Sequence, residues 1–385
     1  MKTVAPSAVI FFSNYTTGLL ATMDSMGSIN IIKSDDADGW NRILQKAYQF
    51  DFYHTLEYHL IAEQRGKGKP LLFSYENDAY CIGLPLLLRP INLDGISIPG
   101  FQELFDVTSV YGYGGPIFSH KKIPSEFIKA FSASLINILR EMHVVSLFSR
   151  LHPLIFMNPS FDNYFTRKVI GQTVSIDLTI SKEDKCGQYR TDHRQGIKKL
   201  KKAGFTCVED LKLNYLDDFI RIYHETMSRV DAHPLYFFDK NYFDSLLRNM
   251  KGMMHLFACM KDGEVACMGV FSLCNGIVQY HLSGSCSRFR KYAPMKLLID
   301  FVRDWGIEHH AHTFHLGGGV GSKEDSLLDF KSGFSNQRHE YSVWEKILMP
   351  EEYKLLCENN HDANKTNNAA KGRDYYFPLY RFGSS

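Results

Sequence analysis

The chain has 385 residues, of which 44% are hydrophobic and 14% aromatic, and its formal net charge is +2. Two domains, or one large duplicated fold, are expected at this length, and the apolar content is sufficient for their cores. A charge this close to zero gives no indication of DNA binding. The sequence has no run of 18 apolar residues, so it predicts no membrane-spanning helix.

The first 28 residues are predicted to be a poorly ordered leader, with the fold starting near Ile29. Their apolar stretch is interrupted by Ser13, Asn14 and two threonines, which argues against a signal peptide. The eight cysteines include no Cys-x-x-Cys pair, so neither a zinc knuckle nor a redox motif is indicated. Most lie in apolar surroundings, as reduced core cysteines do. We therefore expect a cytoplasmic protein, with a peripheral place at the inner membrane left open.

The first half of the chain predicts the order helix, hairpin, loop, helix, strand. Apolar residues at helical spacing mark the helices, and strand-like runs flank the turn at Asn77. The expected elements are a helix at 40–50, strands at 70–75 and 79–88, an aromatic and glycine-rich loop at 106–116, a helix at 125–142 and a strand at 144–148.

The second half repeats this order around an Asp-Gly hairpin turn at 262–263. The expected elements are strands at 254–260, 265–273 and 277–282, a loop at 283–292, a helix from Pro294, and strands at 313–316 and 341–347. A strand at 173–178 and a basic helix at 189–203 lie between the halves. The shared order predicts a duplication. The predicted division is a first domain at 29–172, a second domain at 173–350 with the donor site, and a tail at 351–385 that packs back on the body.

A lysine interrupts an apolar helix face near the end of the second half. Leu327, Phe330, Lys331 and Phe334 share one face of the predicted helix. An unpaired ammonium is costly to bury. Two interpretations are therefore open: the lysine stem covers the core while its head reaches water, or Lys331 is an active-site residue.

The segment 283–292 joins a strand to a helix N-terminus, where unpaired N–H groups and the helix dipole favour anions. Arg288, Arg290 and Lys291 add positive charge. We therefore predict a pyrophosphate or other anion here, with an ordinary basic surface loop as the alternative. The predicted cofactor contacts are Ser285, Ser287, Arg288, Phe289, Arg290 and Tyr292.

Other candidate motifs give weaker indications. The glycines at 317–321 fit neither a P-loop nor a dinucleotide-binding pattern, because Ser322 precedes Lys323 and stands where the last glycine of the latter belongs. The histidines at 309–315 match no zinc template, so no metal is predicted. His281 lies in a strand near the anion loop, as a general base or as a hydrogen-bonded core residue. The lysines at 198–202 form either a solvated helix face or phosphate contacts.

Four blocks of the sequence, in chain order, resemble Fem-type transferases, which are tandem acyltransferases of the GNAT superfamily. They are DVTSVYGYGGPIF (106–118), YRTDHRQGIKKLKKAG (189–204), IYHETMSRVDAHPLYFF (222–238) and LGGGVGSKEDSLLDFKSGFS (316–335). The resemblance spans about residues 40 to 347. It implies an α/β (α+β) fold of two tandem GNAT-like domains, each a mixed, mostly antiparallel sheet flanked by helices.

The resemblance also implies an enzyme that transfers an acyl group to an amine, with Lys331 in the active site of the second domain. His281 is a second catalytic candidate. The implied donor is acyl-CoA, bound at 285–292, although only Gly284 stands for the glycines usual in that loop. Acceptor contacts are expected from the residues that match family loops: Tyr111, Tyr113, Arg194 and Tyr223.

Three functions follow from this resemblance. The first is transfer from acyl-CoA to an amine of a cell-surface glycan or cell-wall precursor, in polysaccharide or cell-envelope biosynthesis. The second uses aminoacyl-tRNA as the donor and a peptidoglycan precursor as the acceptor. The third is a binding protein that keeps the fold and has lost the chemistry.

Overall fold

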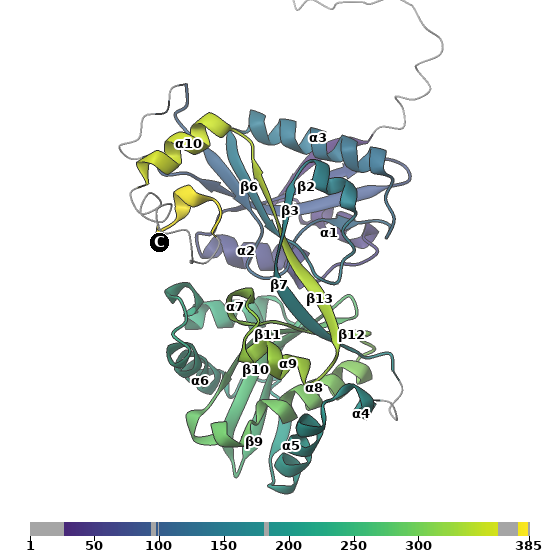
Figure 1. The fold of residues 1–385 in the computed structure, drawn as a ribbon, viewed down its shortest axis with the longest axis vertical. Helices are drawn as coiled ribbons and strands as arrows, with labels where there is room; N and C mark the ends of the chain where they lie inside the picture. Colours follow the sequence, from purple (N-terminus) through teal and green to yellow (C-terminus); the bar gives the residue numbers. More distant parts are fainter. Residues whose placement is uncertain (1–26, 94–97, 99, 181–184, 361–375, 384–385) are drawn as a thin grey trace, which may run out of the picture.

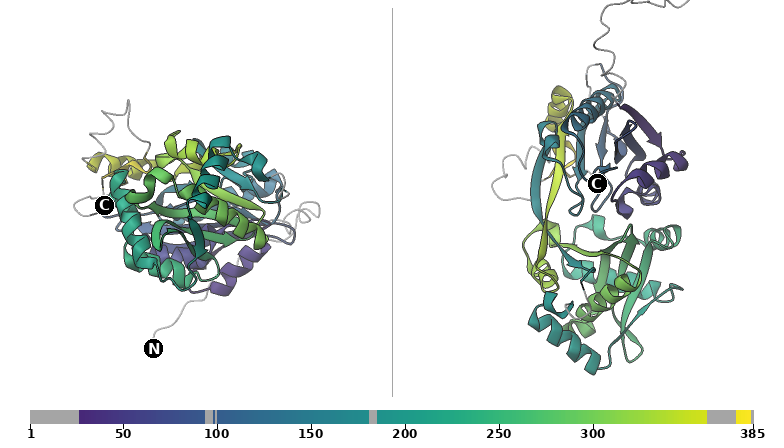
Figure 2. Two further views of the ribbon diagram at one scale, coloured as in Figure 1. Left: turned by 90° about the horizontal axis from the view of Figure 1, so that it is seen from below. Right: turned by 90° about the vertical axis from the view of Figure 1, so that its right-hand side faces the viewer.

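The computed structural model describes residues 27–93, 98, 100–180, 185–360 and 376–383. Of the predicted leader, residues 1–26 lie outside the described residues. The chain forms two lobes stacked along the long axis of the molecule, and two long strands, β7 (Thr166–Asp177) and β13 (Gln337–Ile347), run from one lobe into the other (Figure 1). The turned views show these strands along one side of the molecule (Figure 2).

Within the described residues, a single sheet of 13 strands passes through both lobes in the order β1-β2-β3-β4-β6-β13-β7-β12-β11-β10-β9-β8, with β5 paired to β3. The other bounds are β1 (Ser28–Lys33), β2 (Lys69–Glu76), β3 (Cys81–Pro90), β4 (Phe105–Thr108), β5 (Ile117–Phe118), β6 (Val144–Arg150), β8 (Thr206–Glu209), β9 (Met254–Lys261), β10 (Glu264–Cys274), β11 (Ile277–Ser285) and β12 (Thr313–Gly318). The pairs β4–β6 and β11–β12 are parallel, and the other pairs are antiparallel.

The strand order has the same pattern from either edge, and this pattern confirms the predicted duplication. Four strands in antiparallel order lead to one parallel pair, β4–β6 in the first lobe and β11–β12 in the second. The next strand inward comes from the other half of the chain. β7 follows β6 in sequence but pairs with β12, and β13 follows β12 but pairs with β6. The two halves have therefore exchanged their last strands.

Helices cover the sheet in both lobes (Figure 1). They are α1 (Ala37–Lys46), α2 (Leu56–Gln64), α3 (Ser125–Glu141), α4 (Lys185–Gln188), α5 (Thr191–Lys202), α6 (Leu216–Arg229), α7 (Lys240–Asn249), α8 (Met295–Glu308), α9 (Ser326–Ser332) and α10 (Pro350–Asn359). The predicted helices at 125–142, 189–203 and after Pro294 are confirmed as α3, α5 and α8. The first predicted helix was placed too late. Asp36 accepts the N–H of Gly39 at 2.9 Å and starts α1 before Trp40, and the chain is already extended at Ala47.

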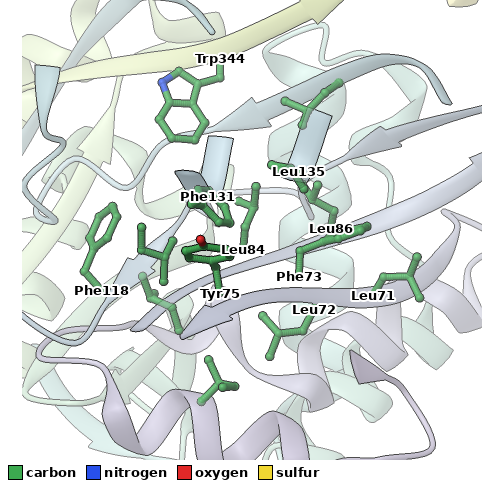
Figure 3. Packing of buried hydrophobic residues seen from close by; sticks show 14 of the residues in the cluster. Leu71, Leu72, Phe73, Tyr75, Leu84, Leu86, Phe118, Phe131, Leu135 and Trp344 are labelled. Carbon is green, nitrogen blue, oxygen red and sulfur yellow. The ribbon is translucent and has the colours of Figure 1, made fainter. Parts of the chain in front are cut away.

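The exchanged strand β13 contributes a large side chain to the core of the first lobe. Trp344 is fully buried, and its ring stacks on Phe165 with centroids 4.8 Å apart and lies 4.9 Å from Phe161. Figure 3 shows Trp344 above the packed side chains of Phe131 and Leu84. Burial of such a ring stabilises a fold by a few kcal/mol. The first lobe therefore depends on a residue from the end of the second half.

Several predicted boundaries in the sheet were wrong. β11 runs on to Ser285, inside the loop predicted at 283–292, and β13 begins at Gln337 rather than at Tyr341. Residues 106–108, expected in a loop, belong to β4, where Val107 pairs with Leu88 and Leu147. β7 begins at Thr166 rather than near 173. The sequence pattern did not reveal this earlier start, because residues 166–169 are solvent-exposed and carry no apolar alternation. The predicted domain boundary at 172–173 falls inside this strand, and the division of domains remains a prediction.

The end of the described chain packs against the first lobe. Asp106 on β4 is buried, and it accepts hydrogen bonds from Tyr380 at 3.1 Å and from Arg381 at 2.5 Å. Arg89 donates to the same carboxylate at 2.6 Å, so two guanidinium groups compensate one buried charge. No helix in the part of the chain that the structure describes is both long and apolar enough to cross a bilayer.

Candidate active site

Lys331 lies buried on α9, whose start is fixed by Asp325. The carboxylate of Asp325 accepts the N–H groups of Leu327 and Leu328 at 3.0 and 2.9 Å. Lys331 is 6% exposed, and its Nζ donates to the carbonyl oxygen of Gly318 at 2.7 Å. Its Nζ also lies 5.2 Å from the ring centre of Tyr280. The interpretation that its head reaches water is therefore wrong. Burial lowers the pKa of the Lys331 ammonium to about 7, with Asp325 acting in the opposite direction.

The lysine lies where the parallel strands of the second lobe separate. β11 and β12 pair only from Ile277 to Gln279 and from Thr313 to His315. Beyond that point β12 continues beside β7 alone, through Gly317 and Gly318. A parallel pair that diverges leaves the facing backbone edges open to a ligand. Gly317 has a φ of +74°, and a Cβ there would lie 3.0 Å from the Tyr113 hydroxyl and 3.4 Å from Lys331 Nζ. The glycine therefore lets both polar groups approach the strand end.

Tyr113 reaches this point from the first lobe, on the loop between β4 and β5. Its ring packs edge-on against His315 and Tyr341, with centroids 4.9 and 5.0 Å away, and against Tyr53 at 5.7 Å. Burial raises the pKa of the Tyr113 phenol, while the backbone of Gly318 acts in the opposite direction. The phenol therefore stays protonated at neutral pH and can donate a hydrogen bond. The first lobe thus supplies a donor to the lysine site of the second.

His281 on β11 connects the two lobes through phenol hydroxyls. Its Nδ1 lies 3.4 Å from the Tyr53 hydroxyl, on a 3-10 turn of the first lobe (η2, Phe52–His54), and its Nε2 lies 3.2 Å from the Tyr242 hydroxyl on α7. Burial lowers the pKa of His281 to about 3. The imidazole is therefore neutral, and both nitrogens already have partners. This arrangement favours a hydrogen-bonded bridge over a general base, and a catalytic role for His281 remains a prediction.

The predicted acceptor residues lie in two places. Tyr111 joins the aromatic group around His281, with ring centroids 6.2 Å apart, and packs against Tyr236 at 5.8 Å. Tyr223 is buried on α6 and donates to the carbonyl oxygen of Tyr236 at 2.7 Å. Tyr111, Tyr113 and Tyr223 are thus linked through the interface between the lobes. Arg194 lies on α5, where its guanidinium donates to Thr191 Oγ1 at 3.0 Å, and its place in an acceptor site remains a prediction.

The predicted anion loop contains a 3-10 turn, η5 (Ser287–Tyr292), and α6 packs against it. The N–H of Ser285 donates to Thr226 Oγ1, and the N–H of Ser287 donates to a carboxylate oxygen of Glu225, each at 3.0 Å. The Ser287 contacts lower the pKa of Glu225. Two amides of the predicted cradle therefore already have acceptors, and one acceptor is itself an anion.

The side chains of this loop point in different directions. Arg288 forms an ion pair with Glu264, and Phe289 is buried in the core of the second lobe. Arg290 and Tyr292 are exposed. Their role in holding a donor remains a prediction. In the part of the chain that the structure describes, no three His, Cys, Asp or Glu side chains are grouped so that they could hold a metal ion.

Sequence reasoning missed Tyr53, Tyr242 and Glu225 as parts of the site. Tyr53 and Tyr242 meet His281 from positions 228 and 39 residues away, so no local pattern connects them. Glu225 had a signal, because it lies in the block at 222–238 that resembles the Fem family. Its bond to Ser287 spans 62 residues and follows from the packing of α6 on β11.

Comparison with known families relates part of the second lobe to a known domain. Residues 187–332 match the family described as "Acetyltransferase (GNAT) domain". This match covers the anion loop, the diverging strands and Lys331. This part of the second lobe is therefore similar to a GNAT acetyltransferase domain. No curated protein matches the chain significantly.

Comparison with solved structures defines the particular fold. FemX superimposes with a TM-score of 0.66 at 12% identity, over 85% of this chain and 99% of that one. L-PGS from Bacillus licheniformis gives 0.52 at 12% identity, over 84% and 96%. The C-terminal domain of a putative lysylphosphatidylglycerol synthetase from Agrobacterium fabrum gives 0.51 at 13% identity, over 81% and 92%. The chain therefore has the fold of FemX across both lobes.

Proposed function

We propose that the chain transfers an acyl group to an amine of a cell-surface glycan or cell-wall precursor, at the point where Tyr113 of the first lobe meets Lys331 of the second. The observation that carries this proposal is the buried Lys331, whose pKa is about 7 and whose Nζ lies at the end of the diverging strand β12. Groups with strongly shifted pKa values are concentrated at functional sites. A structural lysine would gain nothing from this loss of solvent.

The proposed chemistry is direct transfer. An acceptor amine that has lost its proton attacks the carbonyl carbon of an ester or thioester, and a tetrahedral oxyanion forms. The Lys331 ammonium and the Tyr113 hydroxyl approach the same point beside Gly317, so both can donate to that oxygen. Collapse of the oxyanion breaks the bond to the leaving thiolate or alkoxide, and the proton lost by the nitrogen passes to it through solvent. Holding both substrates between the lobes supplies the remaining rate enhancement.

Two donors are compatible with this chemistry. The GNAT domain favours acyl-CoA, the usual donor of that class. The bond from Ser287 to Glu225 favours the second candidate, an aminoacyl ester carried by tRNA, because a carboxylate occupies an amide predicted to hold the CoA pyrophosphate. If acyl-CoA is the donor, Glu225 has to leave Ser287 before the pyrophosphate binds.

The test is titration calorimetry of the full chain with coenzyme A, with charged tRNA and with a sugar nucleotide, followed by transfer assays with labelled acetyl-CoA and aminoacyl-tRNA. With a CoA donor, Glu225→Gln should bind coenzyme A several-fold more tightly than the wild type. The matched control is Asp218→Asn, an exposed carboxylate on the same helix that pairs with Arg221. Heat with the sugar nucleotide alone, and no turnover with either donor, would show a binding protein and contradict the proposal.

A further inference from the structure

A cavity of about 340 Å³ lies between the lobes, away from Lys331. α2 of the first lobe and α7 of the second form its walls. The polar side chains that line it are Gln64, Arg65, Asp239, Asn241, Tyr242 and Ser245. A cavity of this size and polarity fits part of a small polar ligand rather than an apolar chain.

Arg65 is the cation of this cavity. Its guanidinium lies over the rings of Phe238 and Tyr242, with the central carbon 4.6 and 4.9 Å from the ring centres. Stacking on two rings holds the planar group in one orientation. Among the described residues, no carboxylate lies within ion-pair distance of Arg65, whereas the nearby Arg89 is paired with Asp106. A fixed guanidinium without an anionic partner matches the geometry of a carboxylate or phosphate.

The other charged groups around the cavity leave this preference in place. Burial lowers the pKa of Lys67, and the nearby charges of Arg65 and Arg89 lower it further. Asp239 lines the opposite wall, but its carboxylate caps α7 by accepting the N–H of Tyr242 at 2.9 Å. The guanidinium of Arg65 on the α2 side is therefore the group that can bind an anionic ligand, while Asp239 keeps its negative charge on the facing wall.

Tyr242 connects the cavity with the candidate active site. Its ring supports Arg65 on one side, and its hydroxyl lies 3.2 Å from His281 on the other. His281 in turn contacts Tyr53, whose ring packs on Tyr113. A series of contacting side chains therefore joins the lysine site to Arg65, and an acceptor that lies along the interface between the lobes would be able to reach both.

We propose that this cavity binds the anionic end of the acceptor, a carboxylate or a phosphate group, through the guanidinium of Arg65. The assignment to the acceptor rests on the proposed function. The binding of an anion at Arg65 does not, because it requires no donor and no turnover.

The experiment measures anion binding to the full chain by nuclear magnetic resonance, with chloride at matched ionic strength as the baseline. Line broadening of inorganic phosphate reports one source of the anion, and saturation transfer to acetate reports the other. Arg65→Gln should weaken binding of the preferred probe at least tenfold. Lys67→Gln, the matched control two residues further along, should change binding less than twofold.

A second variant tests the cavity without changing Arg65, in case the substitution of this stacked arginine disturbs the fold. Ser245→Leu narrows the cavity from the α7 side with Arg65 intact, and it should also weaken the probe several-fold. Binding of neither probe above the chloride baseline, equal binding to Arg65→Gln and the wild type, or an equal loss in Lys67→Gln would overturn the inference. Normal anion binding combined with no transfer from any donor would instead contradict the proposed function alone.

Discussion

The two lobes share a topology but differ at the turn that leads into the exchanged strand. In the second lobe this turn is α9, where Lys331 stands between Phe330 and Phe334. In the first lobe it is the 3-10 helix η3 (Pro159–Asn163), where Asp162 stands between Phe161 and Phe165. Phe161 and Phe165 are buried in the first lobe, and in the second lobe Phe334 is buried and Phe330 is partly buried.

The residue between the aromatic anchors differs in burial between the two lobes. The side chain of Asp162 is 37% exposed and pairs with Arg167 at 3.0 Å, so its charge remains in water. Lys331 is buried and has lost most of its solvation. Both turns thus carry aromatic anchors, while at these two equivalent positions only Lys331 of the second lobe is desolvated.

The loops that follow the equivalent strands β4 and β11 also differ. The loop after β4 is aromatic and sends Tyr113 across the interface to Lys331. The loop after β11 is basic and is tied to α6 by Glu225 and Thr226. One lobe therefore carries the lysine and the other contributes Tyr113 to its surroundings, which predicts that neither lobe is active alone.

The largest effect is expected from removing the charged group at each of the two equivalent turns. Lys331→Met should lower kcat at least a thousandfold, roughly 4 kcal/mol, because it removes a buried donor to the oxyanion. Asp162→Asn, at the equivalent position of the first lobe, should leave kcat unchanged. The measurement is steady-state transfer with whichever donor the transfer assays identify, together with a thermal melt. Wild-type activity in Lys331→Met, with an intact melt, would show that this lysine has no catalytic role.

A second comparison tests the strand exchange. Trp344→Ala should destabilise the chain by about 3–5 kcal/mol, because it opens a cavity under Phe161 and Phe165. Urea unfolding followed by circular dichroism measures this loss. Since β13 belongs to both lobes, we expect one shared transition. A second lobe that retains its wild-type midpoint while the first unfolds would contradict this dependence. Trp344→Phe, which keeps most of the packing, is the matched control.

A third variant tests the contribution of the first lobe. Tyr113→Phe retains the ring contacts with His315 and Tyr341 but removes the hydroxyl beside Lys331. We expect about a tenfold loss in kcat, which corresponds to about 1.4 kcal/mol, with little change in the melt. Tyr341→Phe is the control, since its hydroxyl contacts Gly112 at 3.5 Å and the side chain of Arg150. Equal kcat in Tyr113→Phe and the wild type would remove Tyr113 from the site.

The smallest effect concerns stability and pH. In the native state the pKa of Lys331 falls from 10.5 to about 7, so between these values the unfolded chain holds a proton that the native chain lacks. Stability from this group therefore rises with pH in that window, by at most about 1.4 kcal/mol per unit. The advantage of Lys331→Met over the wild type in urea unfolding should shrink from pH 7 to pH 9. A constant difference would show that the ammonium is solvated.

Much of the fold could be predicted from local patterns. The Asp-Gly turn at 262–263 has positive φ at both residues, as the hairpin requires, and α3 follows its apolar spacing closely. Helical periodicity also indicated that Lys331 is unusual, because it places a charged residue on the apolar face of its helix. The duplication was visible only as a shared order of elements.

The rest depended on contacts between distant segments. Nothing local distinguishes a strand that stays in its own half from one that crosses, so the exchange of β7 and β13 could not be read from the sequence. The bridge from His281 to Tyr53 and Tyr242, and the placement of Arg65 over Phe238, arise only when the lobes pack. The predicted anion loop joins β11 to α8, as the sequence indicated. The carboxylate that accepts the N–H of Ser287 in this loop is that of Glu225 on α6, which no local pattern links to the loop.

The exchange of β13 has a consequence for synthesis on the ribosome. One edge of β6 pairs with β4, and the other pairs with residues 343–347 of β13. This second edge stays unpaired until nearly two hundred further residues have been translated. An unpaired edge in a half-finished sheet invites pairing with other nascent chains. Rapid emergence and docking of the second half would therefore protect the first from aggregation.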